Sequence, residues 1–330
     1  MRASADPTTL ADRLRGGDRR ALARAITLVE STRESDARRA ARLLTALDGA
    51  GEGALRVGMT GTPGVGKSTL IEALGLDLVA AGRRVGVLAV DPSSARSGGA
   101  ILGDKTRMPH LARAEAAFIR PSPSRASLGG VARRSREVAA LMAAAGHDPV
   151  LIETVGVGQS ETMVAEMCDI FVLIIAPAGG DELQGVKRGI MELADVILVN
   201  KADGALAAAA ERTRADYAAA LRLLRARPED REGGPKVMCV SAETGTGLDA
   251  AWAEVESLAR WRRQAGHLAR RRAAQARFWF EEELRARLLA RLRTPEARRL
   301  VGEAAGRVAA GRVDAAAAAI EVLDRLEEAG

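Results

Sequence analysis

The stretch GTPGVGKS, from Gly61 to Ser68, decides the fold that this sequence predicts. It satisfies the pattern G-x-x-x-x-G-K-[ST], in which glycines let backbone N–H groups turn inward and surround phosphate oxygens. The segment before it, LRVGMT at 55–60, predicts a buried strand, and the segment after it, TLIEALGLDLVAAG at 69–82, predicts a helix. A phosphate-binding loop between a strand and a helix is therefore expected here.

The residue types in this loop predict its chemistry. Lys67 is expected to reach the β- and γ-phosphates, and the Ser68 hydroxyl is expected to ligate Mg²⁺. The predicted helix begins near Lys67, so the positive end of its dipole adds to the attraction for phosphate. The residues expected to hold the nucleotide in this loop are Gly61, Thr62, Pro63, Gly64, Val65, Gly66, Lys67, Ser68 and Thr69.

Short apolar segments alternate with helical sequence between residues 51 and 260, which is typical of βαβ units. The predicted fold class is α/β, a P-loop NTPase with a mostly parallel sheet flanked by helices. Residues 1–50 predict a helical N-terminal extension, and residues 261–330 predict a helical C-terminal arm. The predicted strands are Leu55–Thr60, Val85–Val90, Ala117–Arg120, Val150–Glu153, Ile170–Ala176, Val196–Asn200 and Lys236–Val240.

The base of the nucleotide is indicated by Asn200-Lys201-Ala202-Asp203, an N-K-x-D sequence at the end of a predicted strand. The Asp203 carboxylate can accept from both N1–H and the 2-amino group of guanine. Adenine offers no such pair of donors, and unpaired polar groups make its rejection strong. Asn200 is expected to hold the phosphate-binding loop and the base N7, and the Lys201 stem is expected to cover the base face.

A second loop near the last predicted strand agrees with guanine. Ser241 and Ala242 precede a glycine-containing turn in CVSAETGTGLD, and the Ala242 N–H is expected to bond the base oxygen. The expected cofactors are therefore GTP or GDP with Mg²⁺.

Three acidic residues are candidates for the Mg²⁺ side of the nucleotide. Asp91 ends one predicted strand, Asp104 lies in GAILGDKTRM, and Glu153 stands where generic GTPases have the Asp of D-x-x-G. Mg²⁺ usually takes one or two protein carboxylates and keeps several waters, so direct and water-mediated contacts both stay open. Asp91 also fits an N-cap or Asx turn, and Asp104 also fits a solvated loop. The expected metal ligands are Ser68, Asp91, Asp104 and Glu153.

Two residues after Glu153 are expected near the γ-phosphate. The Gly156 N–H is expected to sense that phosphate, and Gln159 is a candidate for ordering the attacking water. The alternative for Gln159 is that it simply begins the next helix. Lys67, Glu153 and Gln159 are the expected catalytic residues. Because no general base is evident, we expect slow intrinsic hydrolysis that a partner accelerates.

Composition and charge indicate which kinds of partner and location to expect. The net charge is +6 and the isoelectric point is near 9.9, but the Arg residues alternate with acidic ones in helical sequence. This pattern predicts solvated helix faces, so no nucleic acid is expected as a partner. No run of about 18 uncharged apolar residues occurs, so no membrane span is expected. Cys168 and Cys239 fit buried thiols in a reducing compartment, which predicts a cytoplasmic protein.

Several longer strings resemble one family, the MeaB/ArgK-type GTPases, which are G-protein chaperones of adenosylcobalamin-dependent acyl-CoA mutases, chiefly methylmalonyl-CoA mutase. The resemblance covers at least residues 55–250. The strings that carry it are VGMTGTPGVGKST at 57–69, VDPSSARSGGAILGDKTRM at 90–108, AFIRPSPSRASLGGVARRSRE at 117–137, IETVGVGQSE at 152–161 and APAGGDELQGVKRGIMELAD at 176–195.

The resemblance implies more than the spacing does. It implies GTP-gated delivery of adenosylcobalamin to the mutase, and protection or reactivation of that enzyme. It also implies a homodimer in which residues 261–330 form the dimerisation arm. The aromatic cluster Phe278-Trp279-Phe280 in that arm is expected to pack across the partner subunit, and a ligand site is the alternative. Asp91, Asp104 and Glu153 resemble the family's Mg²⁺-side carboxylates. Residues 179–187 resemble an additional switch loop, in which Asp181 and Lys187 are the residues to test.

Three alternatives stay open. A nickel-insertion metallochaperone GTPase would need His or Cys ligands, yet His110, His147 and His267 are not paired with a cysteine at ligand spacing. A protein kinase, as the ArgK description suggests, would need a group that activates an acceptor hydroxyl, and none is evident. An RNA-associated GTPase would show salt-dependent RNA binding.

Overall fold

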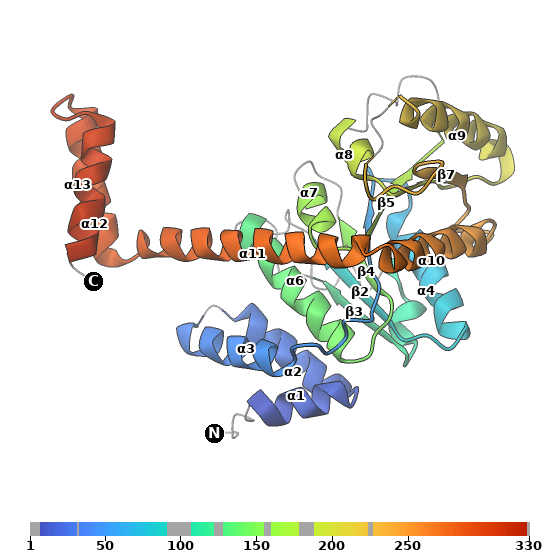
Figure 1. Ribbon diagram of the computed structural model, residues 1–330, viewed down its shortest axis with the longest axis horizontal. Coiled ribbons are helices and arrows are strands. Elements are labelled where there is room, and N and C mark those ends of the chain that lie inside the picture. The colour runs from blue at the N-terminus through green and yellow to red at the C-terminus, as the bar shows by residue number, and fades with distance from the viewer. Residues whose placement is uncertain are drawn as a thin grey trace. The chain divides into compact units, whose positions relative to one another are not determined.

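The computed structural model divides into two compact units, Met1–Gln275 and Ala276–Gly330. Figure 1 shows their helices and strands. The structure describes residues 7–31, 33–90, 107–121, 128–154, 160–177, 188–223 and 227–328.

The first unit is built on a seven-stranded sheet in the order β3-β2-β4-β1-β5-β6-β7 (Figure 1). Neighbouring strands run parallel throughout, and β1 lies between β4 and β5. The strands are β1 (Arg56–Thr60), β2 (Val85–Val90), β3 (Ala117–Pro121), β4 (Val150–Thr154), β5 (Ile170–Ile175), β6 (Val196–Val199) and β7 (Lys236–Cys239).

These strands confirm the predicted α/β fold, because each predicted segment is present. The bounds differ by a single residue at some ends: β4 continues to Thr154, and β6 stops at Val199 rather than Asn200. Strand sequences such as IFVLII in β5 are buried along their whole length. Continuous apolar runs of this kind are expected where helices cover both faces of a parallel sheet.

Two apolar clusters lie on opposite faces of the sheet. On one face, α4 and α10 pack against strand residues that include Val57, Met59 and Val172. On the other, α9 packs against Leu173 and Ile175. The alternation of side chains along β5 explains why neighbouring residues belong to different clusters. The covering helices are α4 (Lys67–Ala80), α6 (Leu128–Ala144), α7 (Ser160–Ala165), α8 (Arg188–Leu193), α9 (Ala207–Leu221) and α10 (Leu248–Gln264), and the short 3₁₀ segments are Leu111–Arg113 and Gly204–Leu206.

The N-terminal segment forms three helices, α1 (Pro7–Arg15), α2 (Arg19–Glu30) and α3 (Glu34–Ala46). The chain turns between α1 and α2 at Gly16-Gly17, and the Asp18 carboxylate then caps α2 by accepting from the N–H groups of residues 20 and 21. These helices pack on one another and on α6 within the first compact unit. The predicted domain boundaries at residues 50 and 260 stay predictions.

The C-terminal part is helical, as predicted. Helix α11 (His267–Arg291) begins in the first unit and continues into the second. The second unit also contains α12 (Pro295–Ala309) and α13 (Ala315–Glu328), which pack together through Leu300, Ala304, Ala318 and Val322. Among the helices of the described ranges, not one is long and apolar enough to cross a membrane.

A buried aspartate precedes β5 at the amino edge of the sheet. Asp169 pairs with Arg56 of β1 at 2.9 Å and with Arg272 of α11 at 2.6 Å. The same carboxylate accepts from the Arg56 backbone N–H at 2.9 Å. Asp169 therefore connects β1 and α11, which are far apart in the sequence, at the amino edge of the sheet.

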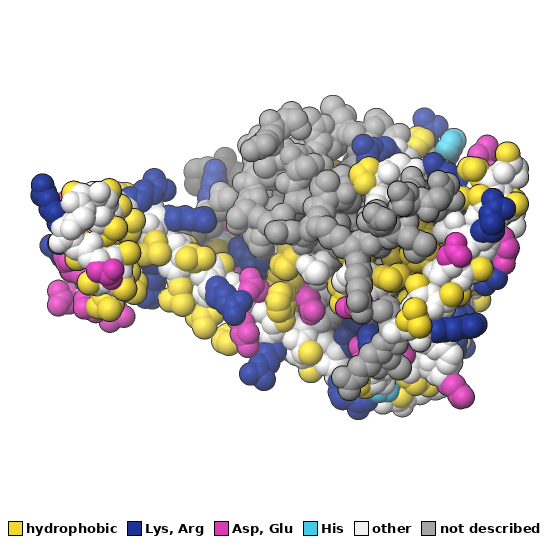
Figure 2. Space-filling model, turned by 90° about the horizontal axis from the view of Figure 1, so that it is seen from above, with side chains coloured by type: hydrophobic (Ala, Val, Ile, Leu, Met, Phe, Trp, Pro, Cys, Tyr) yellow, Lys and Arg dark blue, Asp and Glu magenta, His cyan; other side chains and the backbone are white. Residues whose placement is uncertain are grey.

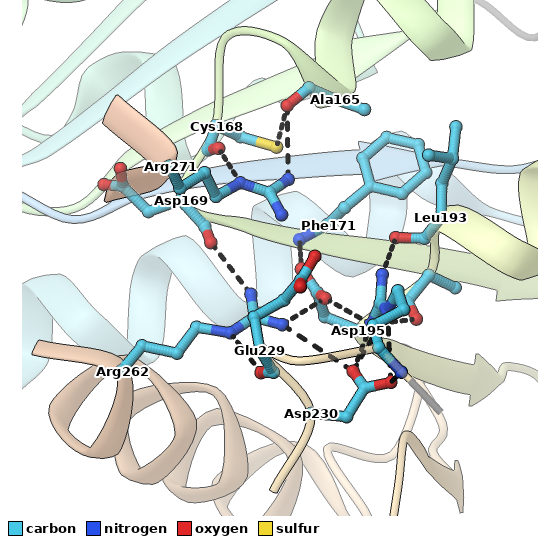
Figure 3. A network of polar contacts seen from close by, with 12 residues as sticks. Ala165, Cys168, Asp169, Phe171, Leu193, Asp195, Glu229, Asp230, Arg262 and Arg271 are labelled. Atoms are coloured by element: carbon cyan, nitrogen blue, oxygen red, sulfur yellow. Dashed lines mark hydrogen bonds and ion pairs between the residues drawn. The ribbon is translucent and has the colours of Figure 1, made fainter. Parts of the chain in front are cut away.

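A second buried aspartate precedes β6 in the same way. Asp195 pairs with Arg262 of α10 at 2.6 Å and with Arg227 at 2.8 Å, and it accepts from the Phe171 N–H of β5 at 2.8 Å (Figure 3). Arg262 is only 1% exposed and also donates to the Asp169 and Glu229 carbonyls. The prediction that the arginines lie on solvated helix faces is wrong for Arg262, because this side chain is buried against the Asp195 carboxylate.

These ion pairs set the charge state of the buried carboxyls. Burial acts to raise the pKa of Asp195, but the hydrogen bond and charge of Arg262 outweigh it and hold that pKa below its ordinary value. Burial also acts to raise the pKa of Asp169, but the hydrogen bonds and charges of Arg272 and Arg56 outweigh it. The pKa of Asp169 therefore also lies below its ordinary value. A carboxyl with a lowered folded-state pKa stabilises the fold above its unfolded pKa of about 3.9, and this contribution is lost as the pH falls through the folded value.

We predict that Arg262→Ala lowers the free energy of unfolding by about 3–5 kcal/mol, because it leaves the buried Asp195 charge short of a partner. The matched control is Arg214→Ala, whose pair with Glu211 on α9 is 36% and 60% exposed. That control is expected to cost less than about 1 kcal/mol. Urea unfolding measures both. Equal losses for the two variants would contradict a special role of the buried pair.

Candidate functional site

The candidate site lies at the carboxyl edge of the parallel sheet. The loop at residues 61–68, here called the P-loop, follows β1 directly, and Glu153 lies at the end of β4. Asn200 follows β6, and Ser241 comes shortly after β7. Because parallel strands share one carboxyl edge, segments far apart in the sequence meet there.

Two close approaches explain the glycines of the P-loop. A Cβ atom at Gly61 would lie 2.1 Å from the Ile174 carbonyl oxygen of β5. A Cβ atom at Gly66 would lie 2.7 Å from Nδ2 of Asn200, and Gly66 also has a φ of +86°. Only glycine fits these positions without displacing the neighbouring strand or the Asn200 amide.

The P-loop leads into the first turn of α4, which begins at Lys67 as predicted. The first amide groups of a helix lack intrahelical partners and favour anions. The Lys67 ammonium is buried and folds back over the loop, donating to the carbonyls of Gly61 at 2.8 Å and Thr62 at 3.0 Å. Thr69 lies in the same first turn of α4. The loop therefore holds its lysine beside the space that a phosphate group would enter.

Ser68 and Glu153 are brought together from different elements. The Ser68 hydroxyl of α4 donates to Glu153 Oε1 of β4 at 2.7 Å. Glu153 is buried and lies opposite Met59 of β1 in the sheet register. Met59 packs in the cluster under α4, so the shared face carries the Glu153 carboxylate toward the start of that helix. An alcohol and a carboxylate side by side form an oxygen donor pair suited to Mg²⁺.

The Asn200 side chain connects two loops. Its Nδ2 donates to the Val65 carbonyl of the P-loop at 2.9 Å, and its Oδ1 accepts from the Ala242 N–H at 3.1 Å. The predicted contact of Asn200 with the P-loop is thus present. The Ala242 N–H was expected on a base oxygen and donates to Asn200 here, so its contact with the base stays a prediction.

Lys201 and Asp203 are held by further contacts. Lys201 has a φ of +61°, unusual for a residue with a side chain, and its ammonium donates to the Gly64 carbonyl at 2.8 Å. Asp203 Oδ1 accepts from the Ser241 hydroxyl at 2.6 Å. The Ser241 hydroxyl in turn accepts from the Thr244 N–H at 3.1 Å. The Asp203 carboxylate is therefore oriented by the loop that follows β7.

Some contacts at this edge were not anticipated from the sequence. The hydroxyls of Thr60 and Thr154, at the ends of β1 and β4, lie 2.8 Å apart and are buried. The bond from Lys201 to Gly64 was also missed. Both depend on which strands become neighbours, and the sequence pattern does not carry that information.

Other predicted site residues lie outside the described residues. These are Asp91 and Asp104 of the metal set, Gly156 and Gln159 near the expected γ-phosphate, and Asp181 and Lys187 in the 179–187 segment. Their roles stay predictions.

Comparison with known proteins identifies relatives over nearly the whole chain. Residues 22–297 match the family described as methylmalonyl Co-A mutase-associated GTPase MeaB. A putative GTPase of Caulobacter vibrioides is 50% identical over 319 residues, which are 96% of this chain and 97% of that protein. The Mus musculus protein named methylmalonic aciduria type A homolog, mitochondrial, is 48% identical over 239 residues, which are 72% of this chain and 57% of that protein.

One solved structure has the same fold along its full length. The crystal structure of LAO/AO transport system kinase is 34% identical in sequence, has a TM-score of 0.76, and covers 99% of each chain. The family match agrees with the P-loop and the Asn200–Asp203 segment, which together predict a GTPase. The chain belongs to the MeaB family of P-loop GTPases.

Proposed function

We propose that the carboxyl edge of the sheet binds GTP with Mg²⁺, and that GTP hydrolysis controls delivery of adenosylcobalamin to methylmalonyl-CoA mutase or a related acyl-CoA mutase. The observation that carries the nucleotide assignment is the placement of Asp203. Its carboxylate is fixed by Ser241, on a segment that Asn200 ties to the P-loop. A carboxylate so oriented accepts from the two N–H donors on one edge of guanine.

The phosphates and the metal are assigned to the start of α4. Lys67 moves from the carbonyls of its own loop to the β- and γ-phosphates, and the amides of the P-loop surround their oxygens. Ser68 and Glu153 would hold Mg²⁺, directly or through water, with Asp91 and Asp104 as further candidates. When bound there, the metal would supply positive charge beside the phosphates. Gly156 is assigned to sensing the γ-phosphate, and Gln159 to ordering the attacking water.

The assignment of the mutase as partner is supported by the description of the matched family. The nucleotide acts as a switch only if the mutase binds the GTP and GDP states differently, and typical couplings of about 1–3 kcal/mol correspond to affinity ratios of roughly 5–150. The free thiols of Cys168 and Cys239 fit a cytoplasmic location.

The nickel-insertion alternative finds no support in the described part of the chain, where no group of three or more His, Cys, Asp or Glu side chains could hold a metal ion. The kinase alternative differs in the fate of the γ-phosphate. It predicts label transferred from GTP or ATP to a protein, whereas our proposal predicts release as inorganic phosphate.

We propose a homodimer that uses the second compact unit. Trp279 is only 2% exposed within the single chain, so the prediction that it packs across a partner subunit is wrong for this residue. Phe280, Leu284 and Leu288 of α11 recur every four residues and therefore share one helix face. They are 66%, 49% and 52% exposed, which is unusual for large apolar side chains. Figure 2 shows hydrophobic side chains at the surface of the C-terminal helices, at the left of the view. We propose that the same face of α11 in a second copy of the chain packs against it.

Of the three predictions that the proposed function makes, the first concerns the mutase. Purified protein should turn over GTP slowly, and the methylmalonyl-CoA mutase of the same organism should accelerate phosphate release severalfold, because the partner completes or orders the switch segments. Lys67→Ala should abolish both rates. Slow turnover without stimulation would remove this mutase as the partner, and equal turnover of ATP would refute the assignment of Asp203.

The second prediction concerns the base. Asp203→Asn should weaken GTP binding roughly 10- to 100-fold, because a charge-assisted bond pair to guanine is lost. The same variant should gain affinity for xanthosine triphosphate, whose 2-oxo group accepts from an amide. Asp216→Asn, on the exposed surface of α9, is the matched control. Titration calorimetry measures both nucleotides, and unchanged GTP affinity in Asp203→Asn would contradict the proposal.

The third prediction concerns assembly. Light scattering should give the mass of a dimer for the unaltered chain and the mass of a monomer for Phe280→Ser/Leu284→Ser/Leu288→Ser. Arg285→Ser is the control, since its side chain is exposed on a different face of α11. A monomeric unaltered protein would rule out the dimer.

A further inference from the structure

The hydroxyl pair of Thr60 and Thr154 lies within the sheet, away from solvent. The two oxygens are 2.8 Å apart, and the residues are 1% and 0% exposed. Thr60 is the last residue of β1, and Thr154 is the last residue of β4. Water cannot replace either partner at such a site, so the bond constrains the two strand ends more than an exposed contact would.

This pair lies next in the chain to residues that are assigned to the proposed nucleotide site. Thr60 directly precedes Gly61 of the P-loop, and Thr154 directly follows Glu153. On its other side Thr154 lies opposite Val90, the last residue of β2, which precedes Asp91. The hydroxyl bond therefore joins the strand that enters the P-loop to the strand that carries Glu153, at the last residue of each strand.

Side-chain alternation places Glu153 and Thr154 on opposite faces of β4. On one face the Glu153 carboxylate accepts from Ser68, and on the other face Thr154 is bonded to Thr60. Displacement of the β4 end would move both side chains together. The threonine bond thus limits how far the Glu153 carboxylate can shift relative to the first turn of α4.

We propose that Thr60 and Thr154 are positioning residues for GTP hydrolysis: their buried hydroxyl bond fixes the distance between the P-loop and the strand end that carries the Mg²⁺-side carboxylate Glu153. This inference rests on the proposed assignment of GTP and Mg²⁺ to the site. We assign the pair no contact with the nucleotide or the metal, and it acts through Glu153.

Valine has nearly the shape of threonine without the hydroxyl, and this allows stability and positioning to be separated. Thr154→Val alone leaves the Thr60 hydroxyl buried without its partner, which destabilises the fold. Thr60→Val/Thr154→Val removes both hydroxyls, and such paired apolar replacement is close to neutral for stability. A purely structural role predicts that the double variant regains normal activity, whereas a positioning role predicts that it does not.

The experiment compares Thr154→Val, Thr60→Val/Thr154→Val and Thr154→Ser in the full chain. Urea unfolding, kcat for GTP, the Mg²⁺ concentration for half-maximal activity and GDP affinity without Mg²⁺ are measured for each. We expect the double variant to have near-normal stability and GDP affinity, with kcat lowered and the Mg²⁺ requirement raised roughly 3- to 10-fold. Thr154→Ser, which keeps the hydroxyl, should restore both kinetic values to within about twofold.

Thr213→Val is the matched control, because Thr213 is also a buried threonine but lies on α9. It should leave kcat and the Mg²⁺ requirement unchanged. Normal kcat and Mg²⁺ requirement in the double variant would overturn the inference, and so would a Thr154→Ser variant as impaired as Thr154→Val. Absence of Mg²⁺-dependent GTP hydrolysis in the unaltered chain would instead overturn the proposed function, and this inference with it.

Discussion

The side-chain amide of Asn200 is the interaction on which the candidate site depends. It donates to the Val65 carbonyl of the P-loop and accepts from the Ala242 N–H, so one buried residue joins three loops of the sheet edge. This proximity requires glycine at position 66, because a Cβ atom there would collide with the amide. An amide is suited to the task since it offers a donor and an acceptor on one rigid plane. The same contact fixes the segment that carries Asp203.

The two edges of the sheet use different physical chemistry. At the carboxyl edge, hydrogen bonds between polar side chains, such as Ser68 with Glu153, connect the segments. At the amino edge, Asp169 and Asp195 are buried and ion-paired with arginines. Breaking such a pair leaves a buried charge, which makes this edge a fixed base for α10 and the beginning of α11.

Much of the fold was predictable because its signals are local. Apolar runs gave the strands to within about a residue at most ends, since strands buried on both faces read as continuous hydrophobic sequence. The P-loop residues could be found because a backbone that surrounds phosphate needs glycines at a fixed spacing. Asn200 could be found because it stands in a short motif at the end of a predicted strand. The buried role of Arg262 was missed, although Arg262 stands seven residues after Val255 and so continues the buried face of α10. What the local sequence could not supply is the partner of this arginine. Its partner Asp195 is 67 residues away in the chain.

The sequence by itself determined the α/β fold class, and it predicted the phosphate-binding loop and the choice of guanine, because each of these signals lies in residues adjacent in the chain. Tertiary structure alone decided which strands became neighbours. The order with β1 between β4 and β5 set Glu153 against Ser68, and it joined Thr60 to Thr154. Contacts of this kind arise only after distant segments pair in one register. Each such contact depends on two residues far apart in the chain, so neither local sequence indicates it.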